Sequence, residues 1–470
     1  MYIYSLDIAL GYRFELYEYK IVIKEFQVNL DIGSFKEVSL ISRLVREKLK
    51  PLLFENIALS AHDFNFVKNN RSKDFFIHLF NTQLCSLVTI EAKTLRKNLC
   101  IDDGVKDIEH SLNGIKKFTK SIYFEDLRRS GFYLFRLVYN IDILTVLKLR
   151  SCVIQFNEIS KIGEIIPNLK RIELDNVYFV KSPSGNNSHD ELAFPTNLYH
   201  LEIIFCKIIY NVELSDPYEF LFNNEFAEAN RFNFPLPKVH IPSLKDLVYY
   251  TDDKENTGLL KFIETNPNLE SLNIGSFDYT LINGFSNIKN LEFNYLTISN
   301  TGYSFPPLKS TINLKINIID FEYYEDVKIF CSSCLNLEYL YFKMSKHENF
   351  QTSIEGFIEP TLFNLFKLKT FELVINSNWY ISSDDESQTN VNNEESIDIS
   401  KLSNIETLIL ETDASTILNL KFANSKTLKK VIFSSSDDEF ITQEFKNKYN
   451  SYKNWKFKFF EHSIKGYKLN

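Results

Sequence analysis

The sequence has little glycine, no long apolar run and no excess of basic residues. Only 13 of 470 residues are glycine, and no phosphate-binding glycine loop, nucleophile elbow or His-Glu-x-x-His motif is present. Acidic residues outnumber Lys and Arg by 61 to 53, which gives no overall attraction to nucleic acid. No signal peptide and no run of about 18 apolar residues is evident. We therefore expect no enzyme, no catalytic residues, no cofactor, no nucleic-acid partner and no membrane span.

Cysteine is also sparse, with six residues scattered along the chain. This is not the dense framework of a small secreted protein, so a reducing compartment, cytoplasmic or nuclear, is expected. Cys331 and Cys334 form a single C-x-x-C pair with no further metal ligand nearby in the sequence. A tetrahedral zinc site needs two more ligands. Core packing is the favoured interpretation of this pair, and a redox or metal role is the alternative.

What the sequence does contain is a recurring apolar triplet with the spacing φ-x-x-φ-x-φ. Clear copies begin at Leu144, Leu169, Leu198, Leu244, Leu269, Ile288, Leu337, Leu368, Ile405 and Leu428. Weaker copies begin at Phe54, Cys85 and Thr119, and the region 308–314 fits only with an inserted residue. Self-similarity of this kind is typical of repeat proteins, in which neighbouring units share one core.

Within each copy the last two apolar residues alternate with polar ones, as in a strand with one buried face. Helix-compatible runs such as GLLKFIETNP and EDVKIFCSSC separate the copies, and several end in proline or asparagine. The pattern predicts an α/β solenoid with a parallel sheet that has one strand in each repeat.

Two copies carry a more specific signature, because L144-T-V-L-K-L-R-S-C152 and L198-Y-H-L-E-I-I-F-C206 match L-x-x-L-x-L-x-x-C. This resembles the cysteine-containing leucine-rich repeat, although Val177 and Phe277 occupy the cysteine position elsewhere. The resemblance implies a curved parallel sheet with helices on its convex side, and a small helical cap at the N-terminus. We expect irregular repeats over 53–470, with insertions at 181–193, 209–242 and 382–398.

The segment before the first repeat, V38-S-L-I-S-R43 followed by P51-L-L-F-E-N-I57, is similar to the second half of an F-box. The first half of that motif is not legible in residues 1–30. The resemblance implies that residues 1–52 dock a Skp-type adaptor of a cullin ubiquitin ligase, through Val38, Leu40, Ile41 and Val45. A plain cap on the repeat core is the alternative, and the two roles are compatible.

Solenoids bind partners on the concave face, to which the polar residues of each strand point. The residues predicted to line it are Arg171, Glu173, Asp175, His200, Glu202, Tyr250, Asn290, Glu292, Asn294, Tyr339, Tyr341, Lys343 and Glu372. This mixed polar and aromatic set suits a protein partner. The favoured function is substrate recognition in a ubiquitin ligase. A scaffold without a link to ubiquitin and an enzyme hidden in the second insertion are the alternatives.

Overall fold

The computed structural model describes residues 43–60, 105–106, 108–181, 192–210, 231–252, 258–278, 285, 287–297, 305–319, 321–345, 350–376, 397–437 and 440–469. The chain forms two compact units, Met1–Gly258 and Leu259–Asn470. Both are α/β structures built on a mostly parallel sheet.

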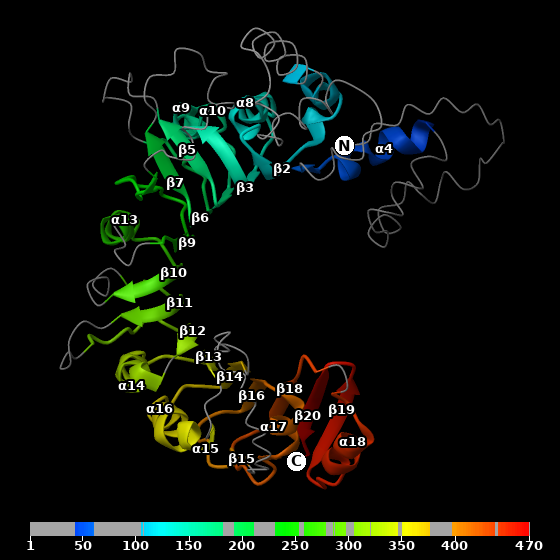
Figure 1. Ribbon diagram of the computed structural model, residues 1–470, viewed down its shortest axis with the longest axis vertical. Coiled ribbons are helices and arrows are strands. Elements are labelled where there is room, and N and C mark those ends of the chain that lie inside the picture. Colours follow the sequence, from blue (N-terminus) through cyan, green and yellow to red (C-terminus); the bar gives the residue numbers. More distant parts are fainter. Residues whose placement is uncertain are drawn as a thin grey trace, which may run out of the picture. The chain divides into compact units, whose positions relative to one another are not determined.

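The main sheet of unit 1 consists of parallel strands that pair in chain order (Figure 1). They are β1 (Asn56–Ser60), β2 (Ser121–Arg128), β3 (Val146–Gln155), β4 (Arg171–Asp175), β6 (His200–Ile204) and β9 (Asp246–Tyr250). The helical segments of this unit are α4 (Arg43–Leu53), η2 (Lys116–Phe118), α8 (Gly131–Leu134), η3 (Phe135–Asn140), α9 (Phe156–Ser160) and α10 (Ile162–Ile165). Helices α8, α9 and α10 lie above the strands of this unit, at the top of Figure 1.

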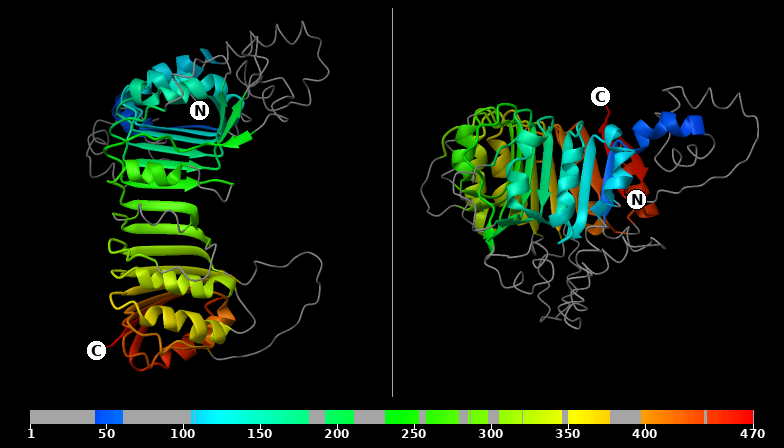
Figure 2. Two further views of the ribbon diagram at one scale, coloured as in Figure 1. Left: turned by 90° about the vertical axis from the view of Figure 1, so that its left-hand side faces the viewer. Right: turned by 90° about the horizontal axis from the view of Figure 1, so that it is seen from above.

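Unit 2 continues the same pattern of in-register parallel pairs, visible as successive rungs in Figure 2. Its strands are β10 (Ser271–Asp278), β11 (Asn290–Thr297), β12 (Asn313–Ile319), β13 (Tyr339–Ser345), β14 (Thr370–Asn376), β16 (Thr407–Glu411) and β18 (Lys430–Ser434). Two antiparallel strands, β20 (Ser463–Lys468) and β19 (Trp455–Phe460), follow β18 in the sheet, and β15 (Ile397–Asp398) pairs with β17 (Leu420–Lys421).

The helical segments of unit 2 come between these strands. They are α13 (Leu259–Thr265), η6 (Phe321–Tyr323), α14 (Tyr324–Ser333), α15 (Phe350–Ser353), the π-helical turn η7 (Ile354–Ile358), α16 (Glu359–Phe363), α17 (Ala414–Leu418) and α18 (Gln443–Asn450). In α13 the residues Leu259, Phe262 and Ile263 are buried, which is the i, i+3, i+4 stripe of an amphipathic helix. Asn266 ends this helix by donating from Nδ2 to the carbonyl of Phe262 at 2.8 Å.

Each apolar triplet outside 85–90 and 308–314 has its last two apolar residues on a strand and in the core. Leu272 and Ile274 of β10, for example, are 1% and 0% exposed. Burial of a leucine or isoleucine side chain contributes about 1.5–3 kcal/mol. The copy at 85–90 lies outside the described residues.

The irregular copy near 308 has a different register from the predicted one. Thr311 takes the first position, followed by Leu314 and Ile316, so no residue is inserted. Thr311 is fully buried, and its hydroxyl donates to the carbonyl of Ile288 at 3.1 Å. Thr119 takes the same position before β2, with its hydroxyl 3.3 Å from the carbonyl of Ile115. A hydrogen-bonded threonine therefore substitutes for leucine at this position.

One backbone carbonyl ties each strand to the strand before it. The carbonyl of Thr145, just before β3, accepts the N–H groups of Lys170 and Arg171 at 2.8 and 3.1 Å. Glu338 does the same in unit 2, accepting from Lys369 and Thr370 at 2.9 and 3.1 Å. The same bifurcated arrangement occurs at the start of the other repeat strands within each unit, so it fixes the register of neighbouring repeats.

Unit 1 has a second row of strands that the sequence pattern does not predict. The end of β3 pairs with β5 (Tyr178–Lys181), which pairs with β7 (Lys207–Tyr210), and β8 (Arg231–Asn233) closes the row antiparallel to β7. Strands β5 and β7 thus reach into the predicted insertions 181–193 and 209–242, and β8 lies within the second. Residues 182–191, 211–230 and 377–396, the bulk of the three insertions, lie outside the described residues.

The main chain turns between the two rows through residues with left-handed backbone conformation. Ser151, Asn176 and Phe205 have φ of 50°, 51° and 48° at equivalent positions. The next residue is buried in each case, as Cys152, Val177 or Cys206. The thiols of Cys152 and Cys206 donate to the carbonyls of Arg150 and Leu174 at 3.1 and 3.4 Å. The cysteine position of the repeat therefore closes this turn.

Candidate functional site

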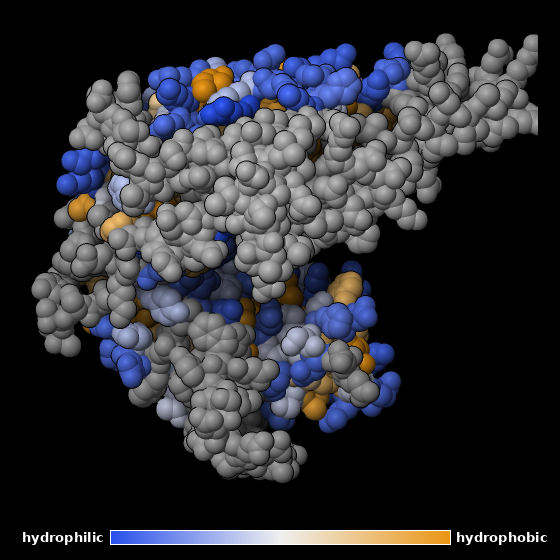
Figure 3. Space-filling model, turned by 45° about the horizontal axis from the view of Figure 1, so that its top comes forward, coloured by the Kyte–Doolittle hydropathy of each residue, from blue (hydrophilic) through white to orange (hydrophobic). Residues whose placement is uncertain are grey.

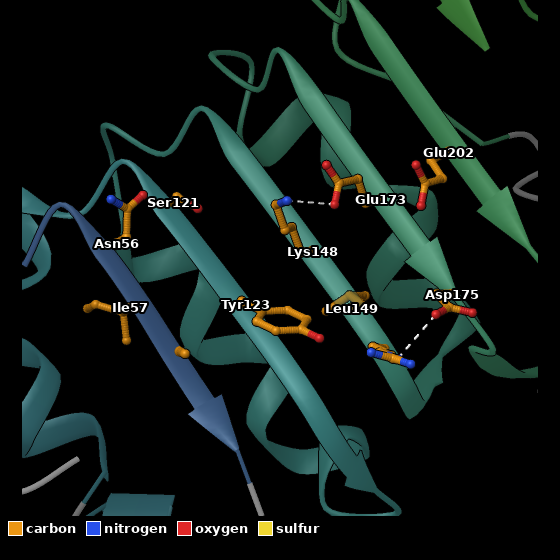
Figure 4. Close-up of a pocket in the computed structure, with 11 residues that line it drawn as sticks. Asn56, Ile57, Ser121, Tyr123, Lys148, Leu149, Glu173, Asp175 and Glu202 are labelled. Atoms are coloured by element: carbon orange, nitrogen blue, oxygen red, sulfur yellow. Dashed lines mark ion pairs between the residues drawn. The ribbon is translucent and has the colours of Figure 1, made fainter. Parts of the chain in front are cut away.

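The candidate site in unit 1 is the sheet face that carries the polar residues of the strands, here called the unit 1 polar face. Parallel pairing places these residues in rows across the sheet. One row runs Tyr123–Lys148–Glu173–Glu202, and the next runs Glu125–Arg150–Asp175–Ile204. In Figure 4 the helices lie behind the strands, and the side chains that point away from them include Tyr123, Lys148, Glu173, Asp175 and Glu202.

Ion pairs link neighbouring strands across this face. Lys148 lies 2.8 Å from Glu173, and Arg150 lies 3.3 Å from Asp175 and 4.0 Å from Glu125. Arg171 also contacts Glu173. Because most of these groups are partly exposed, each pair contributes only about 0–1 kcal/mol to stability. Their main effect is to hold the long side chains in place and to leave a surface of alternating charge.

A depression of about 530 Å³ lies in the middle of the unit 1 polar face. Strands β1, β2, β3, β4 and β6 all contribute to its lining, which includes Ser121, Tyr123, Lys148, Glu173 and Glu202 (Figure 4). Burial and the nearby Glu125 raise the pKa of Tyr123, while Arg150 opposes the shift, so the phenol stays neutral. The depression offers hydrogen-bond donors, acceptors and one aromatic ring to a partner.

His200 is the exception on this face, because only 7% of it is exposed. Its Nδ1 lies 2.5 Å from a carboxylate oxygen of Asp246, and its Nε2 lies 3.6 Å from Glu202. Burial alone would lower the pKa of the imidazole, but the two carboxylates outweigh it and raise the pKa to about 9. His200 is therefore a cation at neutral pH that links β6 to β9 from below the surface.

The equivalent surface of unit 2, here called the unit 2 polar face, is rich in asparagine. Asn317 donates from Nδ2 to Glu292 and to Asn294, both at 3.0 Å, and Asn313 donates to Asn290 at 2.6 Å. On the next strands the hydroxyl of Tyr339 donates to Glu372. Burial and nearby carboxylates raise the pKa of Tyr341 to about 12. Hydrophilic side chains predominate over the described surface coloured in Figure 3, with apolar ones scattered among them.

The structure places every predicted face residue on a strand. Arg171, Glu173 and Asp175 lie on β4, His200 and Glu202 on β6, and Tyr250 on β9. In unit 2, Asn290, Glu292 and Asn294 lie on β11, Tyr339, Tyr341 and Lys343 on β13, and Glu372 on β14. All are at least partly exposed except His200. Whether they bind a partner stays a prediction.

The sequence interpretation missed face residues on β2, β3 and β12. Tyr123, Lys148, Arg150, Lys315 and Asn317 occupy the same polar positions of their triplets as the predicted residues. The signal was therefore present in the repeat alignment. For β12 the shifted register around Thr311 concealed it.

The predicted adaptor-binding residues Val38, Leu40 and Ile41 lie outside the described residues. Val45 lies on α4, and the same helix buries Leu49 completely. Pro51 lies inside α4, which ends at Leu53, so the proline does not stop the helix. Helix α4 then leads through two residues into β1, the strand that pairs with β2.

The C-x-x-C pair lies in the core of unit 2. Cys331 and Cys334 are free thiols with no exposed surface. Burial raises the pKa of Cys334 to about 12, and burial together with Cys334 raises that of Cys331. Neither thiol is thus a reactive thiolate at neutral pH. Among the described ranges, no group of three or more potential metal ligands occurs.

In the described part of the chain, no helix is long and apolar enough to cross a membrane. No protein-family model matches this sequence, and comparison with curated proteins finds no similar chain.

Proposed function

We propose that the chain is a leucine-rich-repeat solenoid of the F-box-like type, with helices on its convex side, that binds a protein partner on its polar sheet faces. The observation that carries this proposal is the row-by-row alignment of polar and aromatic side chains across in-register parallel strands. Such a surface can contact an extended partner across many strands. The proposal assigns no catalytic step and no cofactor to the chain.

By its resemblance to the F-box, the N-terminal segment would attach the chain to a Skp-type adaptor, in the cytoplasm or the nucleus. The polar faces would then present a substrate to a cullin ubiquitin ligase. A scaffold role without ubiquitin is the second candidate. The observation that favours it is the complete burial of Leu49 on α4, which contacts η2 just before β2, because a helix packed on the first repeats serves as a cap even without an adaptor.

Co-purification with a purified Skp-type adaptor tests the ligase role. Val38, Ile41, Val45 and Leu49 form one helical stripe in the sequence, and Leu40 lies beside that stripe. We expect Leu40→Glu to weaken adaptor binding without unfolding the protein. In contrast, Ile41→Glu should weaken adaptor binding and also unfold the protein. The matched control is Leu335→Glu, because Leu335 is 55% exposed on a loop of unit 2.

Thermal unfolding followed by circular dichroism distinguishes loss of binding from loss of fold. If the wild-type chain does not associate with the adaptor at micromolar concentrations, the ligase role is wrong and the scaffold role replaces it.

A further inference from the structure

The last strands of unit 2 give one end of its polar face a different chemistry. Strands β18, β20 and β19 lie side by side (red in Figure 1), and antiparallel pairing aligns their residues. Lys430, Tyr467 and Lys456 form one row, and Ile432, Lys465 and Lys458 form the next. Ser434, Ser463 and Phe460 form the third. We call these three rows the basic end face.

The four lysines of the basic end face differ from three lysines that stand just before repeat strands of the same unit. Lys289, Lys369 and Lys429 each lie 2.6–2.7 Å from a glutamate of the preceding repeat. In contrast, Lys430, Lys456, Lys458 and Lys465 form no ion pair with any described residue. Within the described ranges, therefore, no carboxylate pairs with these four positive charges, although the net charge of the chain is −8.

Apolar groups lie among these charges. Phe460 and Tyr467 are 47% and 41% exposed, and the ammonium of Lys465 lies 4.9 Å from the centroid of the Phe460 ring. Ile432 is partly exposed between them. On the opposite side the hairpin is firmly packed, because the Phe457 ring covers Gly466 and a Cβ there would lie 2.4 Å from a ring carbon. The basic end face is thus backed by closely packed side chains.

We propose that the basic end face binds an acidic, extended segment of a partner protein. This inference rests on the proposed protein-binding function and names the chemistry of the partner. Lys456 and Lys458 are two residues apart on one face of β19, a separation of roughly 6.5–7 Å. Carboxylates at alternate positions of an extended peptide have the same spacing. The apolar residues of such a peptide would contact Phe460, Tyr467 and Ile432.

The rest of the unit 2 polar face favours a protein over a nucleic acid. Glu411 is exposed on β16, and Glu372 and Glu292 lie on β14 and β11. A nucleic-acid strand that extended beyond the three rows would bring its phosphates onto these carboxylates. The basic end face has only three strands, so it matches a short acidic run better than a long polyanion.

Fluorescence anisotropy tests the inference with the full chain and a labelled peptide that alternates glutamate with leucine. The comparison peptide has glutamine in place of each glutamate. We expect the glutamate peptide to bind at micromolar concentrations and to lose about tenfold in affinity between about 50 and 300 mM salt. The glutamine peptide should bind about tenfold more weakly.

The double variant Lys458→Glu/Lys465→Glu should weaken binding of the glutamate peptide about tenfold or more. The matched control is Lys401→Glu/Lys446→Glu, which makes the same charge change at exposed residues outside the basic end face. The control variant should change the affinity for the glutamate peptide by less than about twofold. Both double variants should keep the wild-type melting temperature.

Equal effects of the two double variants, or equal affinity for the two peptides, would overturn the inference. Tighter binding of an oligothymidylate, with the same sensitivity to Lys458 and Lys465, would also overturn it in favour of a nucleic acid. Failure of the acidic peptide to bind while the adaptor co-purifies would reject this inference alone. Loss of adaptor association alone would reject the ligase role but would leave the inference about the basic end face standing.

Discussion

At the scale of single residues, the buried cation at His200 is the feature with the most direct thermodynamic consequence. Its imidazole is held between Asp246 and Glu202, so deprotonation leaves two carboxylates facing each other without the charge that joins them. Removing one partner from a buried charge cluster is costly.

We therefore expect the free energy of unfolding to depend on pH through this residue. The pKa of His200 in the folded protein is about 9, above its ordinary value of 6.5. The stabilisation is fully present below pH ~6.5 and is lost as the pH rises through about 9, a loss of about 3 kcal/mol. Urea unfolding measured between pH 6 and 10 checks this. The variant His200→Gln should be less stable at pH 6, and its free energy of unfolding should depend much less on pH. An unchanged pH dependence would contradict the assignment.

Gly163 shows how a single residue can break a helix. The sequence run EISKIGEIIP is compatible with one helix, but the structure has two, α9 and α10. The N–H of Gly163 donates to the carbonyl of Ala193 at 2.7 Å, and the N–H of Ala193 donates to Ser160 at 2.9 Å. The backbone at Ala193 therefore pairs with N–H and carbonyl groups that would bond to each other's neighbours within a continuous helix.

The variant Gly163→Ala should destabilise unit 1 by about 1–3 kcal/mol. A Cβ at this position would lie 2.4 Å from the Ala193 carbonyl oxygen and 2.5 Å from the Phe194 carbonyl carbon, so the backbone would have to move. Thermal unfolding measures the effect. Gly114→Ala is the control, because a Cβ there meets nothing within 4 Å. A comparable loss of stability in both variants would show that the close approach of the chain at Gly163 does not cause the destabilisation.

At the scale of elements, the period-2 alternation predicted the repeat strands well, because two buried positions in each strand leave a strong signal. The second row, β5 and β7, could not be predicted in this way. Phe179 and Val180 are both buried although adjacent, as are Ile208 and Ile209, so these short strands show no alternation. The left-handed residues at their start are Ser, Asn and Phe, and no glycine marks the turn.

The phase of the strands can be tested with two neighbouring substitutions on β10. Leu272 is 1% exposed, so Leu272→Asp puts an unpaired charge into the core and should cost about 3–5 kcal/mol. Ser271 lies on the polar side of the same strand, and Ser271→Asp should change stability by less than about 0.5 kcal/mol. Chemical denaturation compares the two. Similar destabilisation by both would mean that the strand phase is wrong.

At the scale of the whole chain, charge is distributed very unevenly. Six acidic residues and no basic ones lie in 382–398, so this stretch carries six of the eight excess negative charges. The rest of the chain carries a net charge of only −2, that is −8 minus −6. Glutamates and lysines of neighbouring repeats also pair. The net charge of the sequence therefore hides the local excess of lysine on the basic end face.

Composition alone could not reveal that face. Lys456, Lys458 and Lys465 all lie in 456–470, while Lys430 precedes α18. Antiparallel pairing of β20 with β18 brings them together, and nothing in the triplet pattern predicts an antiparallel hairpin. The site is thus a product of topology, whereas the rows on the polar faces follow from the repeat itself.

The shared carbonyl at each strand start has an evolutionary consequence. Within each unit, the described repeats supply one acceptor and two donors at fixed places, such as the Thr145 carbonyl and the N–H groups of Lys170 and Arg171. Duplication or deletion of a whole repeat would join an acceptor to an equivalent pair of donors, so the junction would be preserved. Descendants of such a chain can therefore change length by whole repeats. Proline, which has no N–H, would be selected against at either donor position.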